Sequence, residues 1–185
     1  MRPVVLQVVD YSLDGIIGEE DTEFFKYCRA VPDHPDDEAW LVGSLESAGV
    51  HVVGRVTYEG MAEYFPAATG PIADAMNRIP KVVFSRTLKT VGWGDTTIVA
   101  GDIATEFDQL RQQGTGDILV HGGVSFARSL VELDVPDEYR LTVYPYLAGS
   151  GQALFAGLGD ARPLELVSSS SFANGIVSLT YRRCR

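Results

Sequence analysis

The sequence is poor in cysteine, in positive charge and in long apolar runs, and each shortage excludes a class of protein. Its 185 residues include 2 cysteines, too few for a disulfide scaffold or a four-thiolate zinc site. We expect Cys28 and Cys184 to be small apolar side chains in a reducing compartment. Lys and Arg total 15 against 25 for Asp and Glu, so the formal net charge is -10. Repulsion therefore opposes binding to nucleic acid or to an anionic membrane, and we expect neither as a partner.

The apolar runs are too short for a signal peptide or a membrane span. Asp10 interrupts the run Val4–Val9, and no alanine-rich cleavage site follows. The sequence therefore predicts a cytoplasmic protein. His34, His51 and His121 lack metal-ligand spacing, and no Gly-x-Ser-x-Gly motif is present. We accordingly predict neither a metal site nor a serine hydrolase.

The composition is that of a folded chain with a core. Hydrophobic residues make up 45% and charged residues 22%, which is ordinary for a globular protein. We see no internal repeat, low-complexity tract or linker, so we predict a single domain over residues 1–185.

As far as residue 133, short apolar runs typical of buried strands alternate with helical patterns. The predicted strands are Val4–Val9, His51–Val53, Lys81–Phe84, Thr97–Val99 and Asp117–Val120. The predicted helices begin near Asp21, Asp36, Thr57, Ile72, Ala104 and Ser125, and the second runs to Ala48 and is ended by Gly49. This alternation indicates an α/β fold, a mostly parallel central sheet with helices on both faces.

The last quarter of the chain changes to strands without helices between them. We predict strands over Glu138–Tyr146, Leu164–Phe172 and Ile176–Arg183. Asn174-Gly175 lies between the last two, and both residues tolerate the positive φ of a tight hairpin turn. The sheet should therefore end in a C-terminal antiparallel hairpin.

Ligands of such a sheet bind beyond the C-terminal ends of its strands, where three junctions carry groups suited to phosphate. At Gly122-Gly123, the backbone either approaches a phosphate closely at a helix N-terminus or simply makes a tight turn. Arg55 either reaches a phosphate or pairs with a surface acid, and Thr57 is a helix cap beside it. Ser85-Arg86 suits a monophosphate such as the adenosine 2′-phosphate of NADP.

Acidic residues gather at the end of the first strand. Asp10, Asp14 and Asp21 lie there, and a carboxyl group near an apolar wall has a raised pKa and can donate a proton. Phe25 could supply such a wall. Alternatively, Asp14-Gly15 is an ordinary turn and Asp21 a helix cap.

Short motifs in a fixed order resemble the dihydrofolate reductase-like superfamily, and in particular the C-terminal reductase domain of the bacterial riboflavin-biosynthesis enzyme RibD. The motifs are Ser12-Leu13-Asp14-Gly15, Gly54-Arg55-x-Thr57-Tyr58-Glu59, Lys81-Val82-Val83-Phe84-Ser85-Arg86, Val120-His121-Gly122-Gly123, Tyr144-Pro145 and Gly149-x-Gly151-x-x-Leu154-Phe155. The resemblance extends over residues 4–183. It implies a three-layer fold and an NADPH-dependent reductase of a small heterocycle, similar to reductases of 5-amino-6-(5-phosphoribosylamino)uracil or dihydrofolate.

The resemblance also implies roles for individual residues. The residues implied to hold the cofactor are Gly54, Arg55 and Thr57 for its phosphates, Ser85 and Arg86 for the 2′-phosphate, and Gly122, Gly123, Val124, Ser125 and Phe126 for the pyrophosphate. It further implies a cis peptide bond between the two adjacent glycines.

The substrate side differs from dihydrofolate reductases. Asp21 has the spacing of their proton-handling carboxylate, four residues before Phe25, but the segment before it is shorter. Asp10 falls where nicotinamide and substrate would meet and is a second candidate for the proton. The substrate would contact Asp14, Phe25, Tyr144 and Pro145. No deaminase zinc motif is present, so the reductase half alone is expected.

Two alternatives to an NADPH-dependent reductase stay open at this point. One is a nucleotide-binding module without turnover, and the other is an oxidoreductase that uses a flavin or deazaflavin on the same fold. The resemblance also makes a homodimer plausible, through the sheet edge or the C-terminal hairpin.

Overall fold

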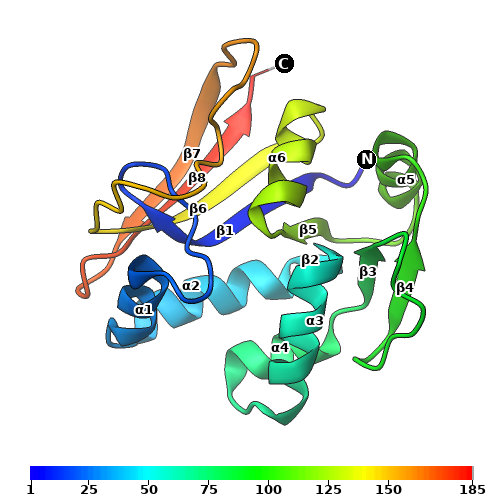
Figure 1. Cartoon of the computed structure of the whole chain (residues 1–185), viewed down its shortest axis with the longest axis horizontal. Coiled ribbons are helices and arrows are strands. Elements are labelled where there is room, and N and C mark those ends of the chain that lie inside the picture. Colours follow the sequence, from blue (N-terminus) through cyan, green and yellow to red (C-terminus); the bar gives the residue numbers. More distant parts are fainter. Residues whose placement is uncertain (185) are drawn as a thin grey trace.

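The computed structural model describes residues 1–184, which build one 8-stranded sheet in the order β4-β3-β2-β5-β1-β6-β8-β7 (Figure 1). The strands are β1 (Val4–Ser12), β2 (Ala48–Gly54), β3 (Lys81–Phe84), β4 (Thr96–Val99), β5 (Asp117–His121), β6 (Glu138–Tyr144), β7 (Leu164–Ser171) and β8 (Val177–Arg183). The helices are α1 (Glu23–Ala30), α2 (Pro35–Glu46), α3 (Arg55–Tyr64), α4 (Pro71–Arg78), α5 (Ile103–Gln112) and α6 (Val124–Glu132), with a 3₁₀ turn η1 (Phe65–Ala67).

Strand direction follows the sequence prediction. The strands from β4 to β6 in the sheet order pair in parallel, whereas β8 is antiparallel to both β6 and β7. Gly175 has a φ of 86° in the β7–β8 turn, where its N–H donates to the Phe172 carbonyl at 3.0 Å. The predicted parallel sheet and C-terminal hairpin are confirmed. None of the helices in residues 1–184 is both long and apolar enough to span a membrane.

Helices cover the sheet on both faces because successive strand residues point to opposite sides. On one face, Leu6 and Val120 pack in a cluster with Phe107 of α5 and Leu130 of α6. On the other face, Leu119 packs in a second cluster with side chains of α2, α3 and α4. Figure 1 shows α2 and α4 on one side of the sheet and α6 on the other. The predicted three-layer arrangement is confirmed.

Several predicted element boundaries are wrong. The first strand runs to Ser12 instead of Val9, because β1 continues its pairing with β6 after an irregularity in register. Helix α1 is capped by Thr22, whose hydroxyl accepts the Phe25 N–H, and not by Asp21. Helix α2 ends at Glu46 and Gly49 already belongs to β2, where a side chain would come within 1.7 Å of the Thr115 carbonyl oxygen.

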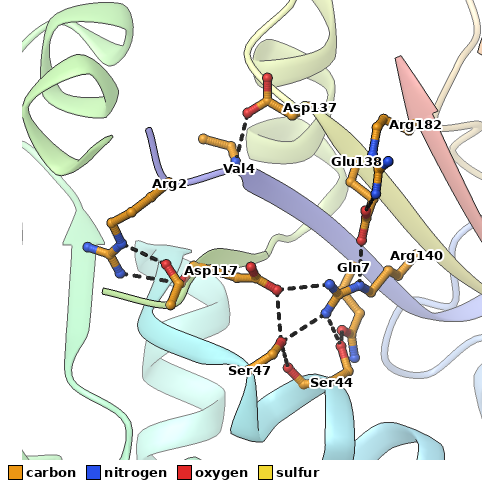
Figure 2. A network of polar contacts seen from close by, with 11 residues as sticks. Arg2, Val4, Gln7, Ser44, Ser47, Asp117, Asp137, Glu138, Arg140 and Arg182 are labelled. Atoms are coloured by element: carbon orange, nitrogen blue, oxygen red, sulfur yellow. Dashed lines mark hydrogen bonds and ion pairs between the residues drawn. The ribbon is translucent and has the colours of Figure 1, made fainter. Parts of the chain in front are cut away.

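A polar network ties α2 to the starts of β5 and β6 (Figure 2). The Arg140 guanidinium lies 2.8 Å from the Asp117 carboxylate and 2.9 Å from that of Glu138. It also donates to the hydroxyls of Ser44 and Ser47 on the α2 side, at 2.7 and 3.2 Å. One guanidinium therefore joins two strands and a helix at the edge of the sheet opposite to the carboxyl ends of the parallel strands.

Replacing Arg140 by alanine should destabilise the protein strongly. The Arg140 side chain is 16% exposed and its partners Asp117 and Glu138 are 17% and 11% exposed, so the change leaves two largely buried carboxylates without it. We expect the free energy of unfolding in urea to fall by about 3 kcal/mol. Arg182→Ala is the matched control, because Arg182 also pairs with Glu138 but is 56% exposed; it should cost less than about 1 kcal/mol. Equal losses in the two variants would contradict the prediction.

Candidate functional site

The three predicted phosphate junctions lie side by side at one edge of the sheet. β3, β2 and β5 are neighbours and run in parallel, so their carboxyl ends meet there. Ser85 follows β3, Gly54 ends β2 and Gly122 follows β5. Segments separated by more than 30 residues in the sequence are thus brought to one place.

Two helix N-termini face this edge without a side-chain cap. The N-caps of α3 and α6 are Gly54 and Gly123, and no side chain of the described chain accepts the first N–H groups of either helix. Such free N–H groups and the positive end of the helix dipole favour an anion. The Thr57 hydroxyl accepts the Gly123 N–H at 2.7 Å and joins the two helix starts. A side chain at Gly54 would approach Phe126 to 3.2 Å, so glycine allows this close packing.

The peptide bond between Gly122 and Gly123 is trans, since residues 1–184 contain no cis peptide bond. The expectation of a cis bond there is wrong. The trans chain already passes from β5 into α6 with the Gly123 N–H directed at Thr57, so the turn is made without the cost of a cis amide.

The side chains around these N-termini differ in whether they already form ion pairs or hydrogen bonds within the protein. Arg55 pairs with Glu59 at 2.8 Å on the exposed face of α3. Ser85 accepts the N–H groups of the two residues after Arg86, at 3.2 and 2.9 Å, and so fixes the turn. Arg86 is exposed and has no ion-pair partner within residues 1–184. Val124 is a core side chain, 3% exposed, so only its backbone faces the edge.

A cavity of about 290 Å³ lies beyond β1, on the face of the sheet that α2 covers. Its floor comes from β1, β6 and β8 and the segments next to them, and its walls come from α1, α2 and the loop between them, with Ile72 of α4. The lining side chains are Val9, Asp10, Cys28, Arg29, Val31, Pro32, Asp33, Asp37, Glu38, Trp40, Leu41, Ile72, Thr142, Tyr144, Asn174, Ile176 and Ser178. Its lining residues near the ends of β1 and β6 place it beside the edge formed by the carboxyl ends of β3, β2 and β5, because β1 is the neighbour of β5 in the sheet.

Asp10 is buried in this cavity and forms an ion pair with Arg29. Burial raises the pKa of the Asp10 carboxyl, and the nearby Arg29 charge opposes this only in part. Burial likewise raises the pKa of the Cys28 thiol to about 12 and raises that of the Tyr144 phenol. The cavity is therefore an environment that disfavours negative charge on its own lining groups.

The other residues predicted for catalysis or substrate contact lie outside this cavity or already have hydrogen-bond partners. Asp21 and Phe25 line a separate, open surface hollow, and Phe25 packs under the Arg29 guanidinium at 4.9 Å. The Asp14 carboxylate accepts the N–H groups of Ala148 and Gly149 at 2.9 and 2.7 Å. The Ser12 hydroxyl also donates to Asp14, at 2.6 Å, and it and the two backbone bonds lower the pKa of Asp14 to about 2.

Tyr144 is the predicted substrate residue that the structure places with Asp10 in the cavity. The neighbouring Pro145 is exposed and lies against the β7–β8 turn, where a side chain on Gly175 would come within 3.3 Å of its ring. Pro145 therefore borders the hairpin and does not line the cavity.

Sequence reasoning missed Glu38, Trp40, Thr142 and Ser178 as cavity residues. Glu38 lies within the second predicted helix and Ser178 within the last predicted strand, and neither was singled out. Alternation along β6 and β8 does assign Thr142 and Ser178 to one face, and they are register partners. Which helix covers that face depends on contacts between segments far apart in the chain, which the strand pattern alone does not give.

A buried histidine pair was missed as well. His51 of β2 and His121 of β5 are 70 residues apart, yet His121 Nδ1 lies 2.7 Å from His51 Nε2. The outer ring nitrogens, His51 Nδ1 and His121 Nε2, have no hydrogen-bond partner in the part of the chain that the structure describes. Burial lowers the pKa of His121 to about 4. Burial, together with the neighbouring His121 and Lys81, also lowers the pKa of His51 well below its usual value.

The fold is shared with dihydrofolate reductase and with a protein of riboflavin biosynthesis, as comparison with solved structures shows. The putative riboflavin biosynthesis protein from Shewanella sp. PV-4 superimposes with a TM-score of 0.80 at 23% identity, covering 99% of each chain. Dihydrofolate reductase from Enterococcus faecalis, solved with NADP(H) and RAB-propyl, superimposes with a TM-score of 0.63 at 15% identity, covering 98% of this chain and 97% of that one.

The chain belongs to the RibD C-terminal domain family, whose model matches residues 3–178. In sequence it is 25% identical to the uncharacterized protein YyaP of Bacillus subtilis strain 168, over 97% of this chain and 94% of that protein. The family is reductase-like, which agrees with the fold.

Stability should fall as the pH is lowered from 7 to 5. An unfolded histidine has a pKa near 6.5, so the folded state, in which the pKa of His121 is about 4, binds fewer protons in this range. Stability is then fully present above pH 6.5 and is lost on acidification toward pH 4. We expect His121 alone to contribute a loss of about 2 kcal/mol between pH 7 and 5. Urea unfolding of wild type and His121→Gln at both pH values measures it, and parallel losses in the two proteins would contradict it.

Proposed function

We propose that this protein is an oxidoreductase that uses NADPH to reduce a small heterocyclic substrate. The observation that carries the proposal is the pair of uncapped helix N-termini, α3 and α6, joined at Thr57–Gly123 on the edge that Ser85 and Arg86 also reach. Family membership and the reductase-type fold support the same reaction class.

The residues at this edge fit the phosphates of such a cofactor. The free N–H groups of the two helix starts suit a pyrophosphate, and the unpaired Arg86 guanidinium suits an additional monophosphate. Arg55 would have to leave Glu59 to contribute, which costs little because their pair is exposed. In an acidic protein, an exposed and unpaired arginine beside two anion-binding helix ends supports preference for NADPH over NADH.

When bound, the nicotinamide cofactor supplies a hydride. A reduction of this kind also needs a proton, and Asp10 is the better supported of the two predicted acids. It lines the cavity, and burial raises its pKa, so that it holds a proton at higher pH than an exposed carboxyl does. Asp21 is exposed at the other hollow. Arg29 would keep Asp10 oriented, because the Arg29 guanidinium donates a hydrogen bond to an Asp10 oxygen, which a protonated carboxyl also accepts.

Substitution of Arg86 by alanine tests the cofactor site. We expect the affinity for NADPH to fall about tenfold to a hundredfold, because a charge-assisted bond to the 2′-phosphate is lost. The affinity for NADH, which lacks that phosphate, should not change. Fluorescence titration of each variant with both cofactors provides the measurement.

Lys89→Ala is the matched control, because Lys89 is an exposed cation three residues further along the same loop. Its NADPH affinity should stay close to that of the wild type. If the wild type binds neither cofactor, the reductase proposal fails. If Arg86→Ala binds NADPH as tightly as the wild type, the assignment of the 2′-phosphate to Arg86 fails.

A further inference from the structure

The cavity between α1, α2 and the sheet is lined by more acidic than basic side chains, and this excess limits the charge that its ligand can carry. Four carboxylates line it, Asp10, Asp33, Asp37 and Glu38, against one guanidinium, Arg29. That guanidinium is already paired with Asp10. A phosphate group entering this space would meet like charges with no free cation to offset them. One solved structure with this fold is described as a 5-amino-6-(5-phosphoribosylamino)uracil reductase, and the cavity departs from what such a phosphorylated substrate requires.

The carboxylates differ in whether they have partners. Asp37 accepts the His34 N–H at 3.4 Å in the cap of α2 and also accepts the Asn174 amide. Glu38 is half-buried, and within residues 1–184 its carboxylate has neither a hydrogen-bond nor an ion-pair partner. Among the cavity's buried and half-buried acids, Glu38 therefore has its acceptor oxygens available to a ligand.

A second unpartnered group lies on the floor of the same cavity. Ser178 of β8 is 2% exposed, and its hydroxyl has no hydrogen-bond partner among the described residues. Buried hydroxyls are nearly always paired, because an unpaired one loses its bonds to water without replacement. Ser178 comes from the sheet and Glu38 from α2, so two independent elements direct unpaired polar groups to one space.

The remaining walls are suited to a flat ring. Trp40 of α2 and Tyr144 of β6 both line the cavity, together with Leu41 and Ile176. Aromatic and aliphatic walls bury the faces of a planar ring, and the few polar groups between them fix its orientation. At about 290 Å³, the cavity lies at the lower limit of the roughly 300–1,000 Å³ of ligand sites, a size that suits a small ring.

We propose that this cavity holds a small planar heterocycle that carries N–H donors and no phosphate, with its N–H groups donating to Glu38 and its ring edge hydrogen-bonded to Ser178. The inference rests on the proposed function, in that the heterocycle is the substrate to be reduced. The proposed substrate of this protein is thus an amino-substituted ring, neutral or cationic, and not a sugar phosphate.

Direct binding of 2,4-diaminopyrimidine, measured by isothermal titration calorimetry with and without NADPH, tests the anchoring residues. Glu38→Gln should weaken binding about tenfold to a hundredfold, because an amide replaces the anionic acceptor, and Ser178→Ala about fivefold. Glu46→Gln is the matched control, since Glu46 is exposed at the other end of α2 and does not line the cavity; it should leave binding unchanged. Thermal unfolding of each variant verifies that it is folded.

A second experiment tests whether the cavity excludes phosphate, by comparing two ligands that share one base and differ in a phosphate group. Cytidine should bind at least tenfold more tightly than cytidine 5′-monophosphate, and raising the salt concentration should narrow the difference. Equal or tighter binding of the monophosphate overturns the inference, as does binding of 2,4-diaminopyrimidine that Glu38→Gln leaves unchanged.

The outcomes separate this inference from the proposed function. If NADPH binds and 2,4-diaminopyrimidine does not, the cofactor proposal stands and the inference about the cavity is wrong. If 2,4-diaminopyrimidine binds in dependence on Glu38 while NADPH does not bind, the inference about the cavity stands and the reductase proposal is wrong.

Discussion

Parallel pairing of the strands from β4 to β6 is the constraint from which the arrangement of this protein follows. Parallel neighbours must be joined by crossover connections, so every strand ends at the same edge of the sheet and every following segment starts there. This brings Gly54, Ser85 and Gly122 together although they are far apart in the sequence. The same geometry places the start of α3 and the start of α6 beside each other, with their free N–H groups at one edge.

The two edges of the sheet are used in different ways. At the amino ends of β5 and β6, charged groups are paired with one another, and Arg140 joins α2 to the strands. At the carboxyl ends, several polar groups have no partner within residues 1–184: the N–H groups of two helices, the Arg86 guanidinium, the Glu38 carboxylate and the Ser178 hydroxyl. The ion pairs at the first edge stabilise the fold, whereas unsatisfied groups at the second suit ligands.

The edge at the carboxyl ends of the parallel strands has two parts of opposite electrostatic character. The part near β3, β2 and β5 presents helix N-termini and an unpaired arginine, which favour an anion. The part near β1, β6 and β8 presents four carboxylates and a paired arginine, which disfavour one. A cofactor rich in phosphate and a substrate without phosphate would each find the complementary side. The net charge of the whole chain carries no such information, because it averages over both parts.

The sequence by itself determined the α/β alternation, the C-terminal hairpin at Asn174-Gly175 and the family resemblance, because periodicity, turn chemistry and short motifs are local properties. It also identified Asp10 and Tyr144, which do lie in the cavity. Only the tertiary structure placed Asp21 and Phe25 at a different hollow, engaged Asp14 with the backbone of residues 148–149, and brought Glu38 and Ser178 to one space. The reason is physical: which side chains share a cavity depends on which helix covers which face of the sheet, and that is decided by contacts between segments far apart in the chain. The His51–His121 pair is of the same kind, since 70 residues separate two rings that parallel pairing sets side by side.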